Sequence, residues 1–286
     1  MNGNNKWALA LIGGCMAAGI CGTGCKPATH TANTATIDSI RIDTTLVLDP
    51  KAKTSPSCKI DISLMYLKTG NKKDTLTGKI NQAFMKAISE KIDKTLPPRF
   101  FADSLTNRFI ADYKQDIQEF YRADEQSGTT QDEVSAWYSY AYSVTTTLQK
   151  GREGVWVYDV TNFQYTGGAH PYTWSQWVNV DAATGKVLAS KDVFLPNTEK
   201  AICSLLQQKL IEETNNALDT DTITSLDGLH SVGVLLEGDL YIPDNFQLGK
   251  EGITFLYNPY DIAPYSMGEI RLTLPYADLK NYLILK

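Results

Sequence analysis

Alternating apolar and polar positions mark the first ordered segment of the chain. In CKIDISLMYLK (residues 58–68), Ile60, Ile62, Leu64 and Tyr66 occupy every second position, which is the period of a strand with one buried face. The preceding residues, 26–56, are rich in Thr, Ala, Pro and Ser and predict a linker with one candidate strand at 39–43. Order is therefore expected to begin near residue 57.

The apolar spacing then lengthens to that of an amphipathic helix. Residues 74–94 and 102–124 each carry one apolar stripe at helical spacing. Pro97 and Pro98 lie between the two segments and are expected to end the first helix. The first stripe is Leu76, Ile80, Phe84, Ile88 and Ile92, and the second is Leu105, Phe109, Tyr113, Ile117 and Phe120.

A β-rich region follows from about residue 135. Residues 135–150 and 155–165 are enriched in aromatic and β-branched side chains and predict an antiparallel hairpin with a turn at 151–154. A third strand is predicted at 173–181, followed by a turn in which Gly185 is left-handed. Farther along, the pattern predicts a helix at 197–215, a strand–turn–strand unit at 232–244, strands at 252–257 and 269–274, and a short helix at 275–283.

These strands and helices occur in blocks and not in strict β–α–β alternation. Blocks of this kind favour an α+β fold. We expect antiparallel sheets with helices packed on one face, arranged as two closely packed halves at 57–150 and 151–286.

The charge balance narrows the class of partner. The 286 residues carry a net charge of -5 and the pI is about 5.3. Nucleic-acid binding would need a basic face, so that class is not expected. An acidic surface permits a basic protein as partner.

The N-terminus has the pattern of a targeting segment. Lys6 precedes the apolar stretch 7–20, and small residues follow it, which predicts a secretory signal peptide over 1–24. Cys25 then becomes the predicted acylated residue of a lipoprotein, with 25–56 as a flexible tether. Acylation of Cys15 and a plain secretory signal are the alternatives. The predicted location is the cell envelope, lipid-anchored and extracytoplasmic, in the periplasm or at the outer membrane.

Two cysteines remain beyond the leader, Cys58 and Cys203. An extracytoplasmic compartment permits a disulfide between them. Two buried free thiols are the alternative.

The sequence offers little that would carry catalysis. His170 and His230 are the histidines beyond the tether, and no HExxH, paired CxxC or nucleotide-binding glycine loop occurs, so we expect neither a metal nor a cofactor. No GxSxG motif marks Ser175 or Ser266 as a nucleophile. Acidic residues at strand ends are usually solvated, which weakens the case for a catalytic pair. The carboxylates in question are Asp159, Asp181, Asp192 and Asp261.

The segment YTGGAHP (165–171) is the most distinctive short motif. Gly167 and Gly168 permit backbone conformations closed to other residues, and Pro171 biases His170 toward an extended conformation. His170 could organise this turn, contact a partner, act as a base or bind a metal, and the first of these is preferred. The neighbouring aromatic residues predict either a contact face or core packing. They are Tyr172, Trp174, Trp177, Tyr260 and Tyr265.

Two blocks of sequence resemble a known family. They resemble the extracytoplasmic C-terminal domain of RsiV-like proteins, the family of the anti-sigma-V factor, a domain long described as of unknown function. Residues 57–150 more weakly resemble the companion domain found in some peptidoglycan deacetylases. The first block holds Tyr165, Gly167, Gly168, Ala169, His170, Pro171 and Trp177, and the second Pro259, Tyr260, Pro264, Tyr265 and Gly268.

This resemblance implies an α+β module outside the cytoplasm that binds lysozyme. The chain departs from the family pattern, because we find no sigma-binding segment, no spanning helix and no deacetylase domain. We therefore expect a non-catalytic, lipid-anchored envelope protein that binds a lysozyme-like protein or cell-wall peptidoglycan. The alternative is an envelope glycan hydrolase, or a deacetylase-associated enzyme, that uses His170 and a nearby carboxylate.

Overall fold

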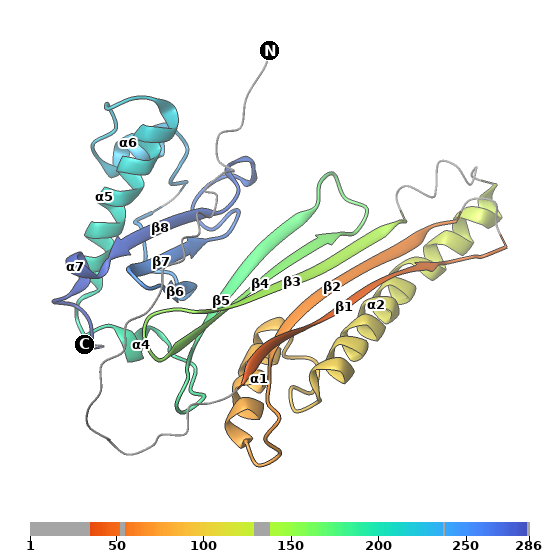
Figure 1. Cartoon of the computed structure of the whole chain (residues 1–286). Coiled ribbons are helices and arrows are strands. Elements are labelled where there is room, and N and C mark those ends of the chain that lie inside the picture. The colour runs from red at the N-terminus through yellow and green to blue at the C-terminus, as the bar shows by residue number, and fades with distance from the viewer. Residues whose placement is uncertain (1–34, 52–54, 129–137, 237, 285–286) are drawn as a thin grey trace.

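A computed structural model describes residues 35–51, 55–128, 138–236 and 238–284. The fold is α+β, as expected, with a five-stranded and a three-stranded sheet (Figure 1). The larger sheet has the order β1-β2-β3-β4-β5. Its strands are β1 (Thr36–Val47), β2 (Ser57–Lys68), β3 (Tyr140–Lys150), β4 (Val155–Tyr165) and β5 (Tyr172–Asp181). The smaller sheet contains β6 (Phe246–Leu248), β7 (Gly252–Tyr257) and β8 (Ile270–Pro275).

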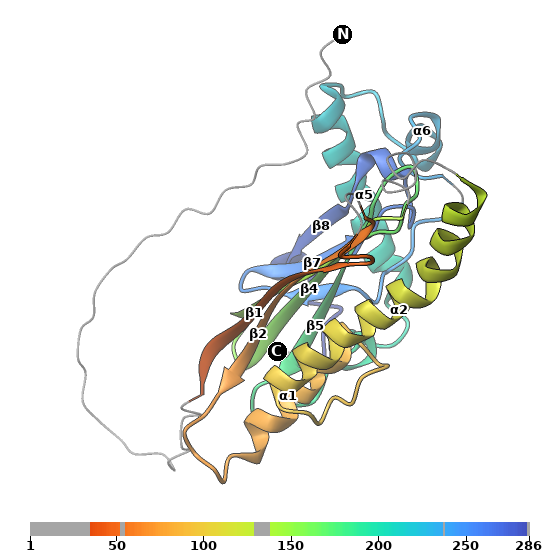
Figure 2. The same cartoon turned by 90° about the vertical axis from the view of Figure 1, so that its right-hand side faces the viewer.

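Neighbouring strands pair antiparallel except β2 and β3, which are parallel. A parallel pair needs a long crossover connection, and here helices α1 (Thr75–Ile88) and α2 (Pro98–Ser127) provide it. Both helices cover one face of the larger sheet (Figures 1 and 2). The remaining helices are α4 (Ser190–Val193), α5 (Glu199–Leu218), α6 (Leu226–Ser231), α7 (Tyr276–Leu279) and the 3-10 turn η1 (Tyr265–Met267).

The first residues of the two crossover helices are set by a capping side chain in α1 and by a proline in α2. Asp74 caps α1, because its Oδ1 accepts the backbone N–H of Thr77 at 3.0 Å. Helix α2 begins at Pro98, a position where the missing proline N–H would have no partner in any case. The sequence-based start near residue 102 was therefore late. Phe120, placed on the buried stripe, is 64% exposed, and Tyr121 is buried instead.

Aromatic rings join these helices to the sheet. Phe84 of α1 stacks on Tyr158 of β4 with ring centroids 4.3 Å apart. Phe109 of α2 stacks on Tyr142 of β3 at 4.5 Å. Such pairs add to the stabilisation from buried area, and they fix the register of the helices on the sheet.

Strand β4 is buried on both faces over its first half. Trp156 and Tyr158 belong to the core under α1 and α2, whereas Val155 and Val157 belong to a second core with the smaller sheet. A continuous apolar run is typical of a strand covered on both sides. The division placed between residues 150 and 151 therefore falls in the β3–β4 turn, and the five-stranded sheet extends across it.

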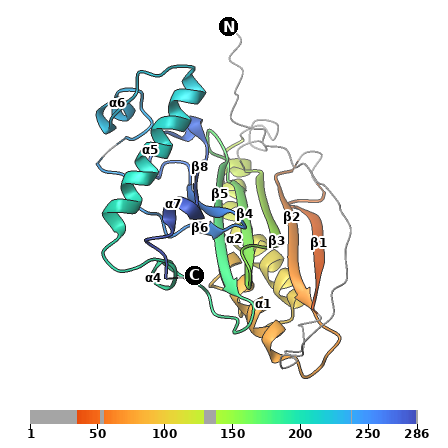
Figure 3. The same cartoon turned by 60° about the vertical axis from the view of Figure 1, so that its left-hand side comes forward.

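Helix α5 covers the smaller sheet on the side away from the larger one (Figure 3). The strand–turn–strand unit expected at 232–244 is absent from the described residues of that segment. Leu235 and Leu240 are buried there, although their backbone is irregular. The apolar pattern of this segment therefore reflects contacts with the core and no strand pairing. The polar residues 219–231 predict a connection without regular structure, but they contain helix α6.

The N-terminal strand is longer than the sequence indicated. Residues 36–47 pair with β2 over their whole length, so this part of the expected tether belongs to the sheet. As an edge strand, β1 alternates between half-buried and exposed positions, which gives a weak sequence signal. The predicted leader, with Cys15 and Cys25, lies outside the described residues. Within the described residues, none of the helices has the length and apolarity needed to cross a membrane.

The two later cysteines are free thiols. Cys58 is buried and Cys203 is half-buried, and they form no disulfide. Burial raises the pKa of Cys58 to about 11, so its reactive thiolate form is suppressed.

Candidate functional site

The two sequence blocks, nearly a hundred residues apart, meet in the structure. The first forms the end of β4 and the loop into β5, and the second forms the connection from β7 to β8. Tyr265 Oη donates a hydrogen bond to the carbonyl oxygen of Pro171 at 2.7 Å. The ring of His170 stacks on that of Tyr265, with centroids 4.1 Å apart.

His170 lies at the surface of this junction. Its Nδ1 is 3.0 Å from the carbonyl oxygen of Pro171, to which it donates when protonated at that nitrogen. Gly167 has φ of 80°, in the region that favours glycine. Gly168 is outside that region, so its backbone does not require glycine. Ala169 is exposed.

The second block holds one tyrosine in an unusual backbone conformation. Tyr260 has φ of 74° and is 54% exposed. Such a conformation in a bulky residue is costly and persists where its surroundings enforce it. Asn258 N donates to Asp261 Oδ2 at 2.7 Å, and Tyr260 N donates to Ala263 O at 3.1 Å. Pro259 is buried, Pro264 precedes η1 and Gly268 follows it.

The rings form two stacked groups, His170 with Tyr265 and Tyr260, and Tyr172 with Trp174, and the charge of Tyr260 acts on Tyr172. We call the two groups together the aromatic patch. Tyr260 lies 5.8 Å from Tyr265, and Tyr172 lies 5.4 Å from Trp174, both as stacked pairs. Partial burial and the nearby charge of Asp261 raise the pKa of Tyr172. The carboxylate of Asp261 therefore lies beside the patch. The aromatic patch comprises His170, Tyr172, Trp174, Tyr260 and Tyr265.

Trp177 does not belong to the aromatic patch. Trp177 is 5% exposed, so of the two alternatives, contact face and core packing, packing describes this residue. Arg271 lies over its ring at 5.2 Å, and Asp159 is its partner across β4 and β5. Asp159 Oδ1 and Trp177 Nε1 are buried without a hydrogen-bond partner among the described residues. Burial raises the pKa of Asp159, and Trp177 and the charge of Arg271 offset this in part.

Asp159→Asn is expected to make the protein more stable at about pH 7. Because the pKa of Asp159 is higher in the folded than in the unfolded protein, folding takes up a proton at pH values between the two. The free energy of unfolding of the wild type therefore falls as the pH rises above the unfolded pKa. The amide stays neutral, and its advantage should vanish toward about pH 4. Thermal unfolding at both pH values measures this. Asp43→Asn, at an exposed site on β1, should keep the wild-type pH profile, and a variant less stable at both pH values would contradict the prediction.

The other candidate carboxylates have structural partners. Asp181 Oδ1 accepts the backbone N–H of Thr184 at 2.7 Å, at the end of β5 far from His170. Asp192 pairs with Lys186. Ser175, a weak nucleophile candidate, is buried with its Oγ 3.1 Å from Thr161 Oγ1. The described residues contain no group of three or more His, Cys, Asp or Glu side chains placed to hold a metal.

Three asparagines, which the sequence did not single out, hold the smaller sheet against edge strand β5. Asn258 Oδ1 accepts Ser175 N at 2.7 Å, and Asn245 Oδ1 accepts Trp177 N at 2.8 Å. Asn179 donates its Nδ2 to Phe246 O at 2.8 Å. We call these three residues the asparagine seam. It satisfies strand-edge groups that would otherwise be unpaired, and through Asn258 it anchors the loop that carries Tyr260.

Residues 191–277 match the protein family DUF3298, which is described as a protein of unknown function. The chain is similar to the crystal structure of a DUF3298 family member from Bacteroides fragilis, with 27% identity and a TM-score of 0.76 over 88% of this chain and 94% of that one. It shares its fold with a DUF3298 family protein from Pseudomonas aeruginosa, with 17% identity and a TM-score of 0.53 over 87% and 95%. Curated proteins give no significant match.

The matched segment contains the second sequence block and the smaller sheet, whereas the first block lies before it. The finer RsiV-like assignment and the deacetylase companion domain stay predictions. Residues 191–277 are thus similar to the DUF3298 family, within a chain similar in structure to proteins of that family.

Proposed function

We propose that this protein is a non-catalytic binding module and that the aromatic patch contacts a protein partner with a basic surface, of the lysozyme-like kind. The aromatic patch carries the proposal, because it gathers stacked rings from both sequence blocks and their neighbours, of which His170, Tyr172 and Tyr260 are exposed and Trp174 and Tyr265 half-buried. Tyrosine and tryptophan are enriched among the residues that dominate binding energy at protein interfaces.

The build of the patch supports binding in two ways. Stacking and the hydrogen bond from Tyr265 restrain the rings before a partner arrives, which lowers the entropy lost on association. Asp261 lies beside the patch, and the chain carries a net charge of -5. Complementary charge would speed the encounter with a basic partner.

The same geometry gives little support to the hydrolase alternative. A general base needs an orienting group and a substrate site within hydrogen-bond reach. The ring of His170 is exposed, and its Nδ1 contacts the adjacent Pro171 carbonyl. Asp181 is at the far end of β5 and belongs to its own turn. Asp261 lies beside the patch, but its Oδ2 accepts the backbone N–H of Asn258 in its own loop.

The proposal includes a location at the cell envelope, with a lipid on Cys25 as anchor. Its support is the sequence pattern of the leader. A protein that stays out of the membrane fraction of wild-type cells would count against the anchor.

Tyr260→Ala is expected to weaken binding of lysozyme by at least about tenfold, the effect of losing one dominant interface residue. Calorimetric titration of the mature protein with lysozyme measures the dissociation constant. Phe100→Ala is the matched control, because Phe100 is 62% exposed but lies on α2, away from the patch. Its affinity should equal that of the wild type.

Peptidoglycan fragments form the second arm of this experiment. If these fragments bind through the patch and lysozyme does not, the ligand class is wrong although the site is right. If neither binds the wild type at micromolar concentration, the binding function itself fails in this form.

A further inference from the structure

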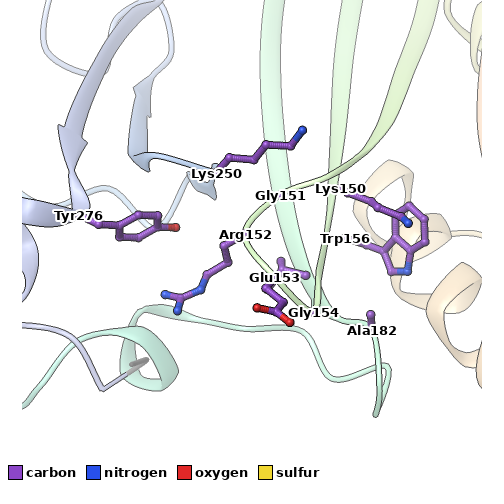
Figure 4. A pocket seen from close by; sticks show the side chains of 10 residues that line it. Lys150, Gly151, Arg152, Glu153, Gly154, Trp156, Ala182, Lys250 and Tyr276 are labelled. Atoms are coloured by element: carbon purple, nitrogen blue, oxygen red, sulfur yellow. The ribbon is translucent and has the colours of Figure 1, made fainter. Parts of the chain in front are cut away.

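A second candidate site lies at the opposite end of the β4–β5 hairpin from the aromatic patch. Strand β4 runs from Val155 to Tyr165, so the two sites are roughly 30 Å apart at the rise of a strand. The β3–β4 turn meets the smaller sheet here and leaves a cavity of about 820 Å³, within the range of small-molecule sites. The residues that matter are Lys150, Arg152, Trp156, Ala182, Lys250 and Tyr276 (Figure 4).

The apolar walls of this cavity are fixed by the fold. Tyr276 donates its Oη to Gly249 O at 2.9 Å and its backbone N–H to Glu251 O at 3.1 Å, which holds the ring against the smaller sheet. Trp156 lines the other end of the cavity from β4 and is 9% exposed, with most of its surface in the core under α1 and α2 (Figure 4). The two walls therefore come from different sheets, and such junctions are common locations of binding sites.

Two of the three cationic side chains are positioned by these rings. Lys150 Nζ lies 5.7 Å from the centroid of the Trp156 ring, and Arg152 Cζ lies 5.1 Å from that of Tyr276. Cation–π contacts restrain the long side chains, which reduces the entropy lost when they bind an anion. Lys250, in the turn between β6 and β7, lines the same cavity (Figure 4).

The cavity is a basic site on an acidic protein. Its lining contains three cationic residues, Lys150, Arg152 and Lys250, and a single carboxylate, that of Glu153. The whole chain, in contrast, has a net charge of -5. Apolar walls focus the field of charges at a cleft. A guanidinium matches the geometry of a carboxylate, and the rings next to the cations leave apolar surface for the rest of a ligand.

We propose that this cavity binds a small carboxylate-bearing ligand built on a ring. The carboxylate would lie at Arg152 and Lys250, on the side of the turn that faces the smaller sheet, and the ring would lie against Tyr276, while Lys150 would add its charge from the other side of the turn (Figure 4). A sugar acid and an aromatic acid share this chemistry, so the experiment distinguishes these two sources.

Matched pairs of ligands test the proposal on the intact mature protein. Calorimetry compares glucuronate with glucose, and 3-phenylpropionate with 3-phenylpropanol. At least one acid is expected to bind, about tenfold or more tightly than its neutral analogue, and to weaken as added salt screens the charges. The pair that shows this difference identifies the type of ring.

Substitutions locate the binding in the cavity. The double variant Lys150→Gln and Lys250→Gln is expected to lose at least about tenfold in affinity for that acid. Both lysines are exposed, so the fold should persist, which circular dichroism checks. The control is Lys72→Gln with Lys73→Gln, an equal charge change in the exposed turn before α1, and it should bind like the wild type.

Three results would overturn the proposal: no heat from either acid at millimolar concentration, equal binding of acid and neutral analogue, or an equal loss in both double variants. Tyr260→Ala should leave acid binding unchanged, because the aromatic patch is at the other end of the hairpin. This site and the proposed protein-binding function can therefore fail independently.

Discussion

Asn179→Ala is expected to lower the free energy of unfolding by about 3 kcal/mol. Asn179 is 2% exposed, donates to Phe246 O at 2.8 Å and accepts from Leu248 N at 2.7 Å. Alanine would leave these two backbone groups buried without partners, and each such group costs about 1–3 kcal/mol. Urea denaturation followed by circular dichroism measures the loss.

Two further variants show whether hydrogen bonding is the cause. Asn179→Asp keeps the shape and can accept from Leu248 N, but it cannot donate to Phe246 O, so it should also be destabilised. Asn162→Ala is the matched control, because this half-buried residue of β4 makes no side-chain hydrogen bond to another described residue. If Asn179→Ala were no less stable than Asn162→Ala, the asparagine seam would not hold the two sheets together.

The strands with strong patterns were predictable from the sequence. Strands β4 and β7 occupy the expected residues 155–165 and 252–257, because continuous burial and turn residues at both ends define them. The stripe of α2 was right at Leu105 and Tyr113 but wrong at its C-terminal end. At that end the expected positions no longer coincide with the buried face of the helix, because Tyr121 is buried and Phe120 is exposed.

The contacts between the two sheets could not be predicted. Asn245 and Asn258 pair with backbone groups of β5 about 70 to 83 residues away in sequence, and side-chain-to-backbone bonds leave no periodic signal. Strand β6 has three residues, too few for a pattern. The cavity likewise joins a turn near 152 to residues 250 and 276, which become neighbours through the seam.

The aromatic patch lies between these two cases. Its members were visible in the sequence, within the two motif blocks or next to them, but their exposure was not. Trp174 and Trp177 are three residues apart on β5. Trp177 is buried, whereas Trp174 is half-buried and belongs to the patch. Alternation along a strand separates them: Tyr172 and Trp174 share one face, and Trp177 faces Arg271 and the smaller sheet.

The β3–β4 turn approaches the smaller sheet more closely than any side chain would permit. A Cβ atom on Gly151 would lie 2.1 Å from the carbonyl oxygen of Leu248 and 2.7 Å from Cγ2 of Val157. That oxygen accepts the backbone N–H of Arg152 at 3.0 Å. The obstacle is therefore mainly backbone, and it cannot retreat without breaking a bond between the two sheets.

Gly151→Ala is accordingly expected to cost about 3 kcal/mol of unfolding free energy, the upper range for overpacking a buried contact. The substitution should also lower the affinity of any ligand that binds in the cavity, because the turn that carries Arg152 must move. Denaturant unfolding measures the first effect and calorimetry the second. Gly70→Ala is the control, because a Cβ there would meet no atom within 4 Å, and its stability should stay within about 0.5 kcal/mol of the wild type. A Gly151→Ala protein as stable as this control would show that the turn and the smaller sheet move apart at little cost.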